Sequence, residues 1–577
     1  MVTMKPKEGK QFLVRMRVVF GFMVLAGFVL IANLFYIQIT NGSRFRAQAD
    51  GQYVVSTYNS FERGSIYLED KDGTRVTAAG QKSGYKVSIN PSTFSADPDD
   101  ITEKIQSIVP DFDPQVLIDA LSRENRTYVE IVNQLNKEDG EALKEILGKA
   151  AQLHAEKWRV YPLGGSAAHV LGFLGYEGDD YNGRYGLERQ YEDTLKREDV
   201  DVYTNFFARI FHNVETFVDP DKVPEGDIVA TIDPEVQLFL ERELFGVYDT
   251  WSSASVGGII VNPKTGEVYA MGAVPTFDNN DFSEEAISVF KNPLVENVHE
   301  MGSIMKPLIV AMAIDSNSID PDTLSYYDTG SVEVGISTIK NFDGRGRGWV
   351  DTQEILNQSL NTGMVYISSK IPKETFRDYM GRYGFTGRTG IDLPSEGKNL
   401  TGNLSSNRDI EFANMSFGQG IAVTPIAMAR ALSSLGNGGT LVTPHVVKEI
   451  DYTNGFTKHL DYEAESSVAI SSETSEKISQ MLVNVFDAYR DGGVKLPGYS
   501  IAAKTGTAQI PNPAGGYYDD RNLHSFFGYF PAYDPEFLVF LYTVHPKGVR
   551  YASQTLIDPF LDTAKYLINY YDVPPDR

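Results

Sequence analysis

The amino-acid sequence predicts an α+β protein in three parts: a single N-terminal transmembrane helix, a first exported domain, and a second domain built on one antiparallel sheet with a helical subdomain. One long uncharged apolar segment lies near the N-terminus, and a chain of 577 residues is long enough for several domains. Within residues 229–577, strand-like segments occur at both ends and helical segments lie between them, which is typical of an α+β domain.

Residues 18–39 form the predicted transmembrane helix. The segment carries no charged side chain, and about 20 apolar residues cross the roughly 30 Å hydrocarbon core as a helix. A cleaved signal peptide is the alternative, but its apolar core is usually only about 7–15 residues long. Basic residues precede the segment and favour a cytoplasmic N-terminus: Lys5, Lys7, Lys10, Arg15 and Arg17. We therefore expect residues 1–17 in the cytoplasm, an uncleaved single-pass anchor, and an extracytoplasmic remainder.

The exported chain is predicted to divide into residues 41–228 and 229–577. The first stretch combines strand-like pieces such as Tyr85–Ile89 with an acidic region, residues 100–153, that has apolar residues at helical spacing. A turn at residues 224–227 then precedes a strand, and Asp233-Pro234 opens a helix. The second stretch contains a predicted hairpin, three late strands and a final helix: 255–261 with 267–271, 500–510, 525–530, 537–544 and 559–570.

Composition excludes several classes of function. There is no cysteine, so disulfides, thiolate metal sites and cysteine nucleophiles are excluded. The eight histidines show no H-E-x-x-H pattern, so we expect no metal site, and we expect no cofactor. The net charge of −25, without a strong basic stripe, argues against nucleic-acid binding by phosphate neutralisation.

Three short motifs stand in order within residues 229–577: Ser303-Ile304-Met305-Lys306, Ser359-Leu360-Asn361 and Lys504-Thr505-Gly506-Thr507. Each motif alone is weak, because the same patterns recur at Ser83–Lys86, Ser88–Asn90, Ser405–Asn407 and Lys264–Gly266. The structural context of each motif must therefore decide which serine is a nucleophile with a base beside it.

Ser303 has the context that a nucleophile requires. Pro307 lacks an N–H and is tolerated only in the first helical turn, so the apolar helix that follows must begin near Gly302–Ser303. Ser303 and Lys306 then share one helix face, where the amine can take the hydroxyl proton. The Ser303 N–H has no helical partner and can stabilise an oxyanion, and burial can lower the pKa of Lys306. Ser83 lies in a strand-like stretch, where positions three apart face opposite sides.

The other two motifs are compatible with the same cleft. Ser359 and Asn361 are predicted to lie in a turn that ends a helix over residues 352–360, although a plain helix cap is the alternative. Lys504-Thr505-Gly506-Thr507 lies in a strand of small residues, where Thr505 and Thr507 share a face. Gly506 weakens a strand and indicates close approach by a ligand, and an extended peptide could pair along such an edge.

With these motifs in order, the sequence resembles the class B penicillin-binding proteins, a family of monofunctional peptidoglycan D,D-transpeptidases. The resemblance covers nearly the whole chain and includes Arg63-Gly64-Ser65-Ile66, Arg159-Val160-Tyr161-Pro162, Ala168–Gly172, Gly186-Leu187-Glu188, Thr389–Pro394 and Gly418–Pro425. It implies that residues 41–228 form a non-catalytic, elongated pedestal domain of the dimerisation type, and that residues 229–577 form a transpeptidase domain like the serine β-lactamases. The sequence departs from the family at Met301, where proline is usual, and lacks the expected glycine-rich pattern in residues 196–223.

The resemblance also implies the role of each site residue. Ser303 would attack the penultimate D-alanine carbonyl, with Lys306 as general base. Ser359, Asn361 and Lys504 would relay protons and hold the donor stem peptide. Thr505, Gly506 and Thr507 would bind substrate, the two threonines holding its carboxylate. The N–H groups of Ser303 and Thr507 would form the oxyanion hole.

The implied substrates are peptidoglycan stem peptides, and β-lactams would acylate Ser303 as their mimics. D,D-carboxypeptidase activity would be a side reaction. The implied location is the bacterial plasma membrane, with a polytopic membrane glycosyltransferase and other cell-wall synthesis proteins as partners, in division or in elongation. A β-lactamase would lack the first domain, a bifunctional relative would carry an E-D-x-x-F-x-x-H motif, a β-lactam sensor would need a cytoplasmic output module, and a silent scaffold would have lost a catalytic side chain.

Overall fold

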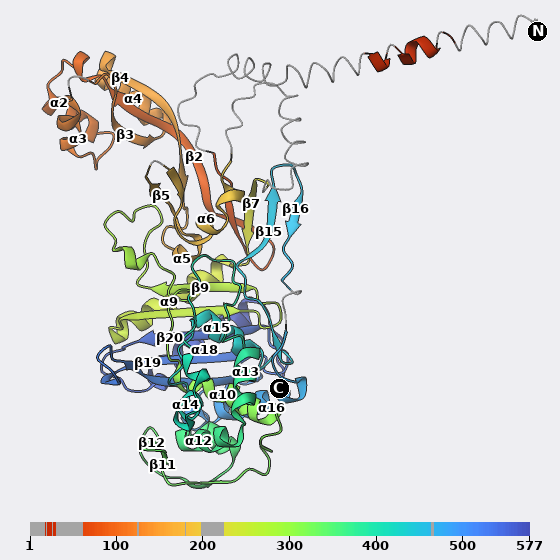
Figure 1. The fold of residues 1–577 in the computed structure, drawn as a ribbon. Helices are drawn as coiled ribbons and strands as arrows, with labels where there is room; N and C mark the ends of the chain where they lie inside the picture. The colour runs from red at the N-terminus through yellow and green to blue at the C-terminus, as the bar shows by residue number, and fades with distance from the viewer. Residues whose placement is uncertain are drawn as a thin grey trace, which may run out of the picture. The chain divides into compact units, whose positions relative to one another are not determined.

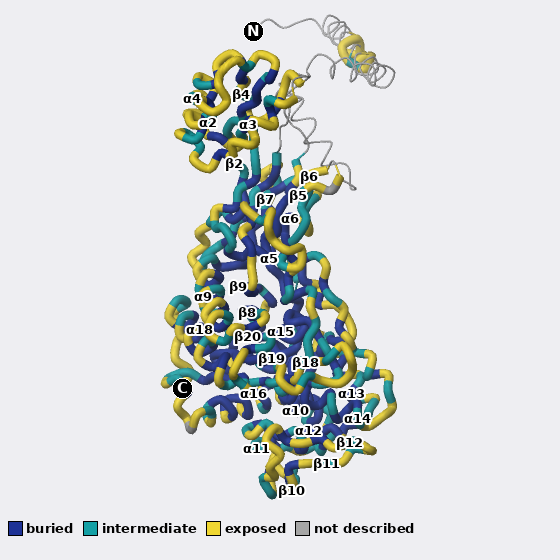
Figure 2. Tube along the Cα trace, turned by 90° about the vertical axis from the view of Figure 1, so that its left-hand side faces the viewer, coloured by how far each residue is buried: buried dark blue, intermediate teal, exposed yellow. Residues whose placement is uncertain are grey.

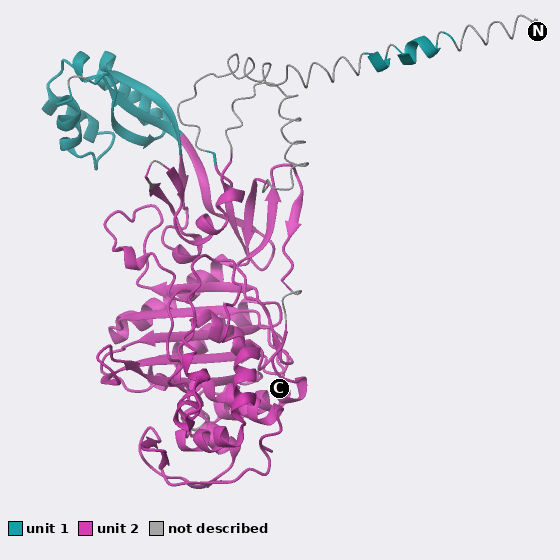
Figure 3. Cartoon of the chain, in the orientation of Figure 1, with its two compact units in different colours: residues 1–62, 84–157, 198–222 teal, residues 63–83, 158–197, 223–577 magenta. Residues whose placement is uncertain are grey.

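The structure is a computed structural model that describes residues 18, 20–25, 27–29, 62–123, 126–178, 180–197, 224–462 and 467–577. The chain forms two compact units (Figure 3). Unit 1 comprises residues 1–62, 84–157 and 198–222, and unit 2 comprises residues 63–83, 158–197 and 223–577. The predicted division at residues 228 and 229 falls inside a strand of unit 2, β7 (Gly226–Ala230), and the division into residues 41–228 and 229–577 stays a prediction.

The predicted transmembrane segment lies largely outside the described residues. Of residues 18–39, those described are helical: 18, 20–25 and 27–29. Across the described ranges, no helix has both the length and the apolar character that a membrane crossing needs. The predicted single-pass anchor therefore stays a prediction, and so does the cytoplasmic segment 1–17.

Unit 1 is a small α+β body with its own core. Buried apolar side chains such as Ile105, Leu117 and Leu143 pack together between its elements. Side chains of Asp97, Asp113 and Asn136 accept hydrogen bonds from the first turns of the three helices, which fixes where each helix begins. Its elements are α2 (Pro98–Gln106), α3 (Pro114–Leu121), β3 (Val129–Leu135), α4 (Lys137–Leu147), and parts of β2 (Arg75–Ile89) and β4 (Ala151–Val160). The predicted helical region 100–153 was wrong at β3, whose short alternating pattern the longer helical pattern obscured.

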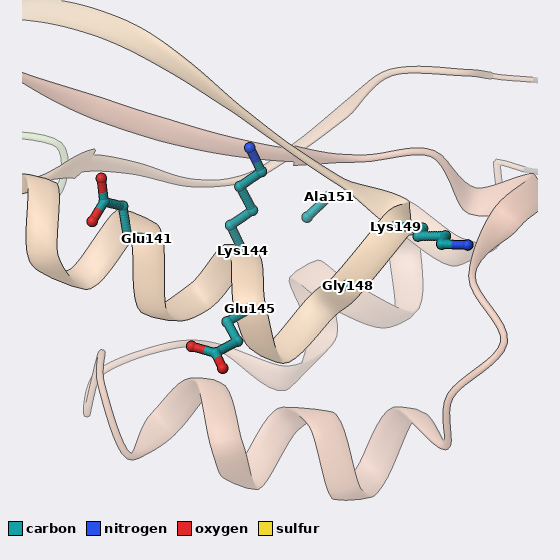
Figure 4. A pocket seen from close by; sticks show the side chains of 6 residues that line it. All are labelled: Glu141, Lys144, Glu145, Gly148, Lys149 and Ala151. Carbon is teal, nitrogen blue, oxygen red and sulfur yellow. The ribbon is translucent and has the colours of Figure 1, made fainter.

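A pocket in unit 1 is lined by Glu141, Lys144, Glu145, Gly148, Lys149 and Ala151 (Figure 4). The charged ends of these side chains point in different directions, so no group of them converges on a ligand. None of the three sequence motifs contributes to this pocket.

The first sheet of unit 2 joins segments from distant parts of the chain. Strand β1 pairs antiparallel with β2 and parallel with β7, and β15 pairs antiparallel with β7. Short helices and a hairpin flank this sheet in sequence. The bounds are β1 (Ile66–Glu69), α5 (Ala168–Leu171), β5 (Leu174–Glu177), β6 (Asp180–Gly183), α6 (Gly186–Gln190), α7 (Glu192–Leu195), β15 (Val447–Tyr452) and β16 (Thr457–His459).

A buried cluster of ion pairs joins residues from three parts of the chain: Arg63, Arg159, and the pair Glu188 and Glu192. Arg63 Nε donates to Glu188 at 2.6 Å, and Arg159 Nε donates to the other oxygen of Glu188 at 2.7 Å. Arg63 also donates to Glu192 at 2.7 Å. The Glu188 side chain is fully buried, so its charge is stable there only because both guanidinium groups neutralise it.

The second sheet of unit 2 has five antiparallel strands in the order β18-β19-β20-β8-β9 (Figure 1). The predicted hairpin and all three predicted late strands are present, which confirms one antiparallel sheet built from both ends of the domain. Strand β18 pairs on one side only and is therefore an edge strand. The bounds are β8 (Ser255–Val261), β9 (Val268–Val274), β18 (Ala502–Pro511), β19 (Tyr517–Phe530) and β20 (Phe537–Val544).

Helices cover both faces of this sheet, and buried residues fill both contacts (Figure 2). On one face, α9 (Pro234–Trp251) and the final helix α18 (Ile557–Tyr570) pack through residues such as Leu240 and Phe560. On the other face lies the larger core, which includes Ile309 and Phe527. Its helices are α10 (Lys306–Asp315), α11 (Thr352–Asn357), α12 (Asn361–Lys370), α13 (Lys373–Arg382), α14 (Asp409–Met415), α15 (Pro425–Ser433) and α16 (Ser472–Asp487).

Short strands and one further helix complete the fold of unit 2. Three two-stranded sheets pair β10 with β13, β11 with β12, and β14 with β17. The bounds are β10 (Tyr326–Asp328), β11 (Ser331–Val334), β12 (Ser337–Lys340), β13 (Gly348–Val350), β14 (Thr440–Leu441), β17 (Ser467–Val468) and α17 (Ala552–Thr555).

Candidate active site

The turn that carries Ser303 is a short 3-10 helix, η5 (Gly302–Met305), which leads directly into α10. Pro307 occupies the first turn of α10, as the sequence predicted. Side chains three residues apart eclipse one another in a 3-10 helix, so Ser303 and Lys306 lie on one side of the turn. The Ser303 N–H falls ahead of the first hydrogen bond of the helix and is left for another acceptor.

Two glycines allow this turn to approach the edge strand β18. Gly302 has φ +64°, and a Cβ at that position would lie 2.8 Å from the Thr507 carbonyl oxygen. A Cβ at Gly506 would lie 2.7 Å from the Met301 carbonyl oxygen and closer still to Ser525 Oγ. The prediction that Gly506 marks an approach by a ligand is therefore refined: the group that approaches Gly506 is the backbone of the turn that carries Ser303.

Ser359 lies in a turn between two helices. Helix α11 ends at Asn357, and Asn361 is the first residue of α12, so the predicted helix over residues 352–360 was too long at its C-terminal end. Ser359 has φ +52°, a left-handed conformation that is uncommon for a residue with a side chain. This strained turn places the Ser359 hydroxyl and the Asn361 amide on the same neighbour, Lys306.

The Lys306 amine is the centre of the site. Its Nζ lies 2.6 Å from the Ser359 carbonyl oxygen, 2.8 Å from Asn361 Oδ1 and 3.1 Å from Ser359 Oγ. Asn361 Nδ2 donates to the Lys340 carbonyl oxygen at 3.0 Å, which turns Oδ1 toward the amine. The first two contacts are acceptors, whereas the Ser359 hydroxyl can also donate to the lone pair of an uncharged amine. No hydrogen bond joins Lys306 to Ser303 within the described ranges, so proton transfer requires a small movement of either side chain.

Both lysines of the site are buried without a carboxylate partner. Lys306 is 0% exposed and Lys504 is 1% exposed, and within residues 224–462 and 467–577 neither forms an ion pair. Burial lowers the pKa of Lys306 well below its usual value, and the charge of nearby Lys504 lowers it further. Burial also lowers the pKa of Lys504 to about 7. An uncharged Lys306 amine can act as a base.

Thr505 and Thr507 lie on the free edge of β18. Lys504 Nζ donates to the Thr505 carbonyl oxygen at 3.1 Å, and the Thr505 N–H donates to Tyr489 at 3.0 Å. Both backbone groups of Thr505 thus point away from β19, and by the alternation of an antiparallel ladder so do those of Thr507. The Thr507 carbonyl lies beside Gly302, so the outward edge of Thr507 adjoins the turn that carries Ser303. The Thr507 N–H is on the same edge, where it can act with the Ser303 N–H.

A pocket of about 580 Å³ adjoins this turn. Glu300 and Gln509 are among the residues that line it, and they neighbour Ser303 and Thr507 in the sequence. The cavity is large enough for a small peptide next to Ser303.

The structure brings together all the residues that the three motifs predicted, and it leaves the repeated patterns elsewhere. Lys264–Gly266 forms the loop between β8 and β9, and Ser83–Lys86 lies in strand β2. His169 is buried and packed, with its Nε2 2.9 Å from the Val289 carbonyl oxygen, and burial lowers its pKa to about 4. The sequence analysis missed Tyr489, which belongs to none of the motifs. Only folding brings its hydroxyl to the Thr505 N–H.

Comparison with known proteins shows which family this chain belongs to. A family model described as the penicillin-binding protein transpeptidase domain matches residues 256–563, and one described as the penicillin-binding protein dimerisation domain matches residues 59–202. Stage V sporulation protein D of Bacillus subtilis is 29% identical over 95% of this chain and 84% of its own length. A peptidoglycan D,D-transpeptidase FtsI homolog of Mesostigma viride is 27% identical over 95% of this chain and 94% of its own length.

A crystal structure of penicillin-binding protein 2X from Streptococcus thermophilus shares the fold. Its TM-score is 0.70 at 21% identity, and the match covers 89% of this chain and 80% of that chain. The transpeptidase model alone matches more than half of the sequence, and the dimerisation model precedes it. The chain therefore belongs to the penicillin-binding protein transpeptidase family, as a class B member that carries a dimerisation domain ahead of the transpeptidase domain.

Proposed function

We propose that this protein is a serine-type peptidoglycan D,D-transpeptidase that cross-links stem peptides through an acyl-enzyme on Ser303. One observation carries the proposal: a buried Lys306 amine, with a lowered pKa and no carboxylate partner, lies on the same side of the turn as Ser303 and bonds to Ser359 and Asn361. That arrangement is a nucleophile with an adjacent base, oriented by a third group.

In the acylation step, Ser303 Oγ attacks the carbonyl carbon of the penultimate D-alanine, and its proton passes to Lys306 Nζ. The carbonyl oxygen becomes an oxyanion between the N–H groups of Ser303 and Thr507. As the C–N bond breaks, the proton returns through Ser359 to the leaving amine of the terminal D-alanine. Lys504, Thr505 and Thr507 hold the carboxylate of that residue, and Gly506 lets the strand lie against the nucleophile turn.

In the second step, an amine of another stem peptide attacks the acyl-enzyme ester and loses a proton to the Lys306–Ser359 relay, and Ser303 leaves with a proton. Water in place of that amine gives D,D-carboxypeptidase activity as a side reaction. A β-lactam presents a similar carbonyl and carboxylate, and its ring opening leaves Ser303 covalently acylated. The name of the matching transpeptidase family supports this part of the proposal.

The proposed setting is the outer side of a bacterial plasma membrane. The uncharged segment 18–39, with basic residues before it, supports a single-pass anchor with residues 1–17 in the cytoplasm. Residues 41–228 would then be the non-catalytic pedestal and residues 229–577 the transpeptidase domain. The proposed partners are a polytopic membrane glycosyltransferase and other cell-wall synthesis proteins, in division or elongation, and the anchor and pedestal are the surfaces we expect them to contact.

Labelling with a fluorescent penicillin tests the proposed nucleophile. Membranes that contain the wild-type chain should show one covalently labelled band, and Ser303→Ala should abolish it because the proposal places Ser303, beside Lys306 and the oxyanion hole, as the attacking hydroxyl. Ser405→Ala is the matched control, since Ser405 belongs to a repeated S-x-N pattern in a short 3-10 helix, and it should label fully. Labelling of Ser303→Ala would exclude the assignment of the nucleophile, and an unlabelled wild-type chain would favour a silent scaffold.

A further inference from the structure

Along the free edge of β18, the outward backbone groups of Thr505 and Thr507 differ in whether they already have hydrogen-bond partners. At Thr505 both outward backbone groups are already satisfied, the carbonyl by Lys504 Nζ and the N–H by the Tyr489 hydroxyl. At Thr507 the outward edge of the backbone adjoins the turn that carries Ser303, with the carbonyl beside Gly302. A substrate strand that pairs with this edge can therefore use the backbone of Thr507 but not that of Thr505, where only the side chain is left.

Both threonine hydroxyls also contact a polar group outside the strand. Tyr489 OH lies 3.3 Å from Thr505 Oγ1, and the Ala552 N–H, at the start of α17, donates to Thr507 Oγ1 at 3.2 Å. A hydroxyl has one hydrogen to donate and two lone pairs to accept. A hydroxyl that accepts from the protein keeps its own hydrogen for another acceptor, and an anion is such an acceptor.

In the contact between Tyr489 and Thr505, the geometry allows either hydroxyl to donate. The Tyr489 oxygen already accepts the Thr505 N–H. Within the described part of the chain, the Tyr489 hydroxyl has no acceptor besides Thr505 Oγ1. With tyrosine as the donor, Thr505 Oγ1 accepts this hydrogen bond and the Thr505 hydrogen is left for another acceptor. Burial raises the pKa of Tyr489, so its hydroxyl stays protonated at neutral pH.

Tyr489 is held in place by elements that lie outside the three motifs. It opens a short 3-10 helix, η8 (Tyr489–Gly492), directly after α16. Its ring packs at 6.0 Å, centroid to centroid, against Phe486, which is buried in the core beneath the sheet. The hydroxyl thus reaches Thr505 from a residue whose ring packs against the C-terminal end of α16.

We propose that Tyr489 is a positioning residue that orients the Thr505 hydroxyl as a hydrogen-bond donor to the substrate carboxylate. This inference rests on the proposed function and adds to it a residue that fixes recognition of the anionic end of the substrate. Tyr489 touches neither the substrate nor the reacting atoms; it acts through Thr505.

The test compares acylation by benzylpenicillin with acylation by its methyl ester, which lacks the negative charge, in the full-length protein. Tyr489→Phe should lower the second-order rate constant with the acid about 10-fold, the change expected when one hydrogen bond to a charged group is lost. The rate constant with the ester should stay within about 2-fold of wild type, because an ester gains little from that donor. Tyr499→Phe is the matched control: its hydroxyl donates to the Val573 carbonyl oxygen, away from Thr505, and neither rate constant should change.

A double-variant cycle separates positioning from damage to the fold. If Tyr489 acts only through Thr505, then Tyr489→Phe should have no further effect on acylation by the acid in a Thr505→Val background. Three outcomes would overturn the inference while leaving Ser303 as the nucleophile. The acylation rate constant could fall equally with the acid and the ester, it could fall with neither, or the effects of the two substitutions could be additive in the double variant. Failure of the wild-type protein to be acylated at all would overturn the proposed function together with the inference.

Discussion

Unit 2 contains two sets of buried charges that are treated in opposite ways. In the cluster of Arg63, Arg159 and Glu188, every charge meets an opposite charge at 2.6–2.7 Å. In the active site, Lys306 and Lys504 are equally buried and have only neutral acceptors around them. Burial alone lowers the pKa of Arg63, but the carboxylates of Glu188 and Glu192 raise it above the usual value, whereas the pKa values of both lysines fall.

The difference teaches which buried charges hold the fold and which perform chemistry. A paired charge is locked in one protonation state and joins distant segments of the chain. An unpaired amine is driven toward its uncharged form, which costs stability but supplies a base. The partners of a buried lysine therefore indicate its role better than its burial does.

The largest expected effect comes from Lys306→Met, which keeps a similar shape without the amine. Acylation by penicillin should fall about 10²- to 10⁴-fold, the range for loss of a general base. The free energy of unfolding should change by no more than about 1–3 kcal/mol. The variant loses the hydrogen bonds to Ser359 and Asn361, but it also no longer buries a polar amine, and the two effects oppose each other. Stopped-flow acylation and denaturant titration measure the two quantities. A variant that acylates at the wild-type rate would remove Lys306 from the mechanism.

The opposite pattern is expected for Glu188→Gln. This change leaves Arg63 and Arg159 buried without a full counter-charge, and should lower the free energy of unfolding by about 3–5 kcal/mol. The fraction that remains folded should be acylated at the wild-type rate, because Glu188 contacts no site residue in the described ranges. Denaturant titration measures the free energy of unfolding, and the acylation rate of the folded protein is measured alongside it. An unchanged unfolding midpoint would contradict the role of Glu188 in stabilising the fold.

A smaller effect is expected for Lys504→Gln, on the pH dependence of acylation. Below about pH 7 Lys504 is charged, and that charge opposes protonation of Lys306. Its removal raises the pKa of Lys306, so the base becomes protonated at a higher pH and the acidic limb of the profile moves to higher pH. Acylation rates across the acidic and neutral range give the position of the limb separately from its height. A limb that stays in place, or moves to lower pH, would show that the two lysines are not coupled.

The smallest effect is expected for Lys86→Met, which alters the repeated S-x-x-K pattern in strand β2. Lys86 pairs with the partly exposed Glu130, and a surface pair of this kind contributes about 0–1 kcal/mol. Penicillin labelling should be unchanged, in contrast to Lys306→Met. Loss of labelling would contradict the assignment of Ser303–Lys306, rather than Ser83–Lys86, as the motif that reacts with penicillin.

Much of the site could be predicted from the sequence because each motif had a local constraint. Pro307 fixed the start of the helix that carries Ser303, and the small residues around Gly506 indicated a strand that something approaches closely. The end of α11 at Asn357 could not be predicted, because Ser359 takes a left-handed conformation that its own residue type does not favour. Tertiary contacts with Lys306 support that conformation.

Other features depended on contacts between distant segments. The five-stranded sheet could be predicted from alternating strands at both ends of the domain, whereas the parallel pair of β1 with β7 could not, because it joins residues far apart in sequence. Strand β3 was missed, since a short alternating segment lay within a longer helical pattern. Tyr489 was missed for the same physical reason: only the folded chain brings its hydroxyl to Thr505.

Direct titration of the Lys306 amine tests the central claim, that an unpaired buried lysine is the base for Ser303. In protein labelled with ¹³C-lysine, the Cε resonance that disappears in Lys306→Met belongs to this residue, and its shift with pH gives the protonation state. We predict the shift of an uncharged amine at neutral pH, and a pKa well below that of the exposed lysines. A resonance that stays at the position of a charged ammonium into the alkaline range would contradict the account, because such a group could not accept the proton of Ser303.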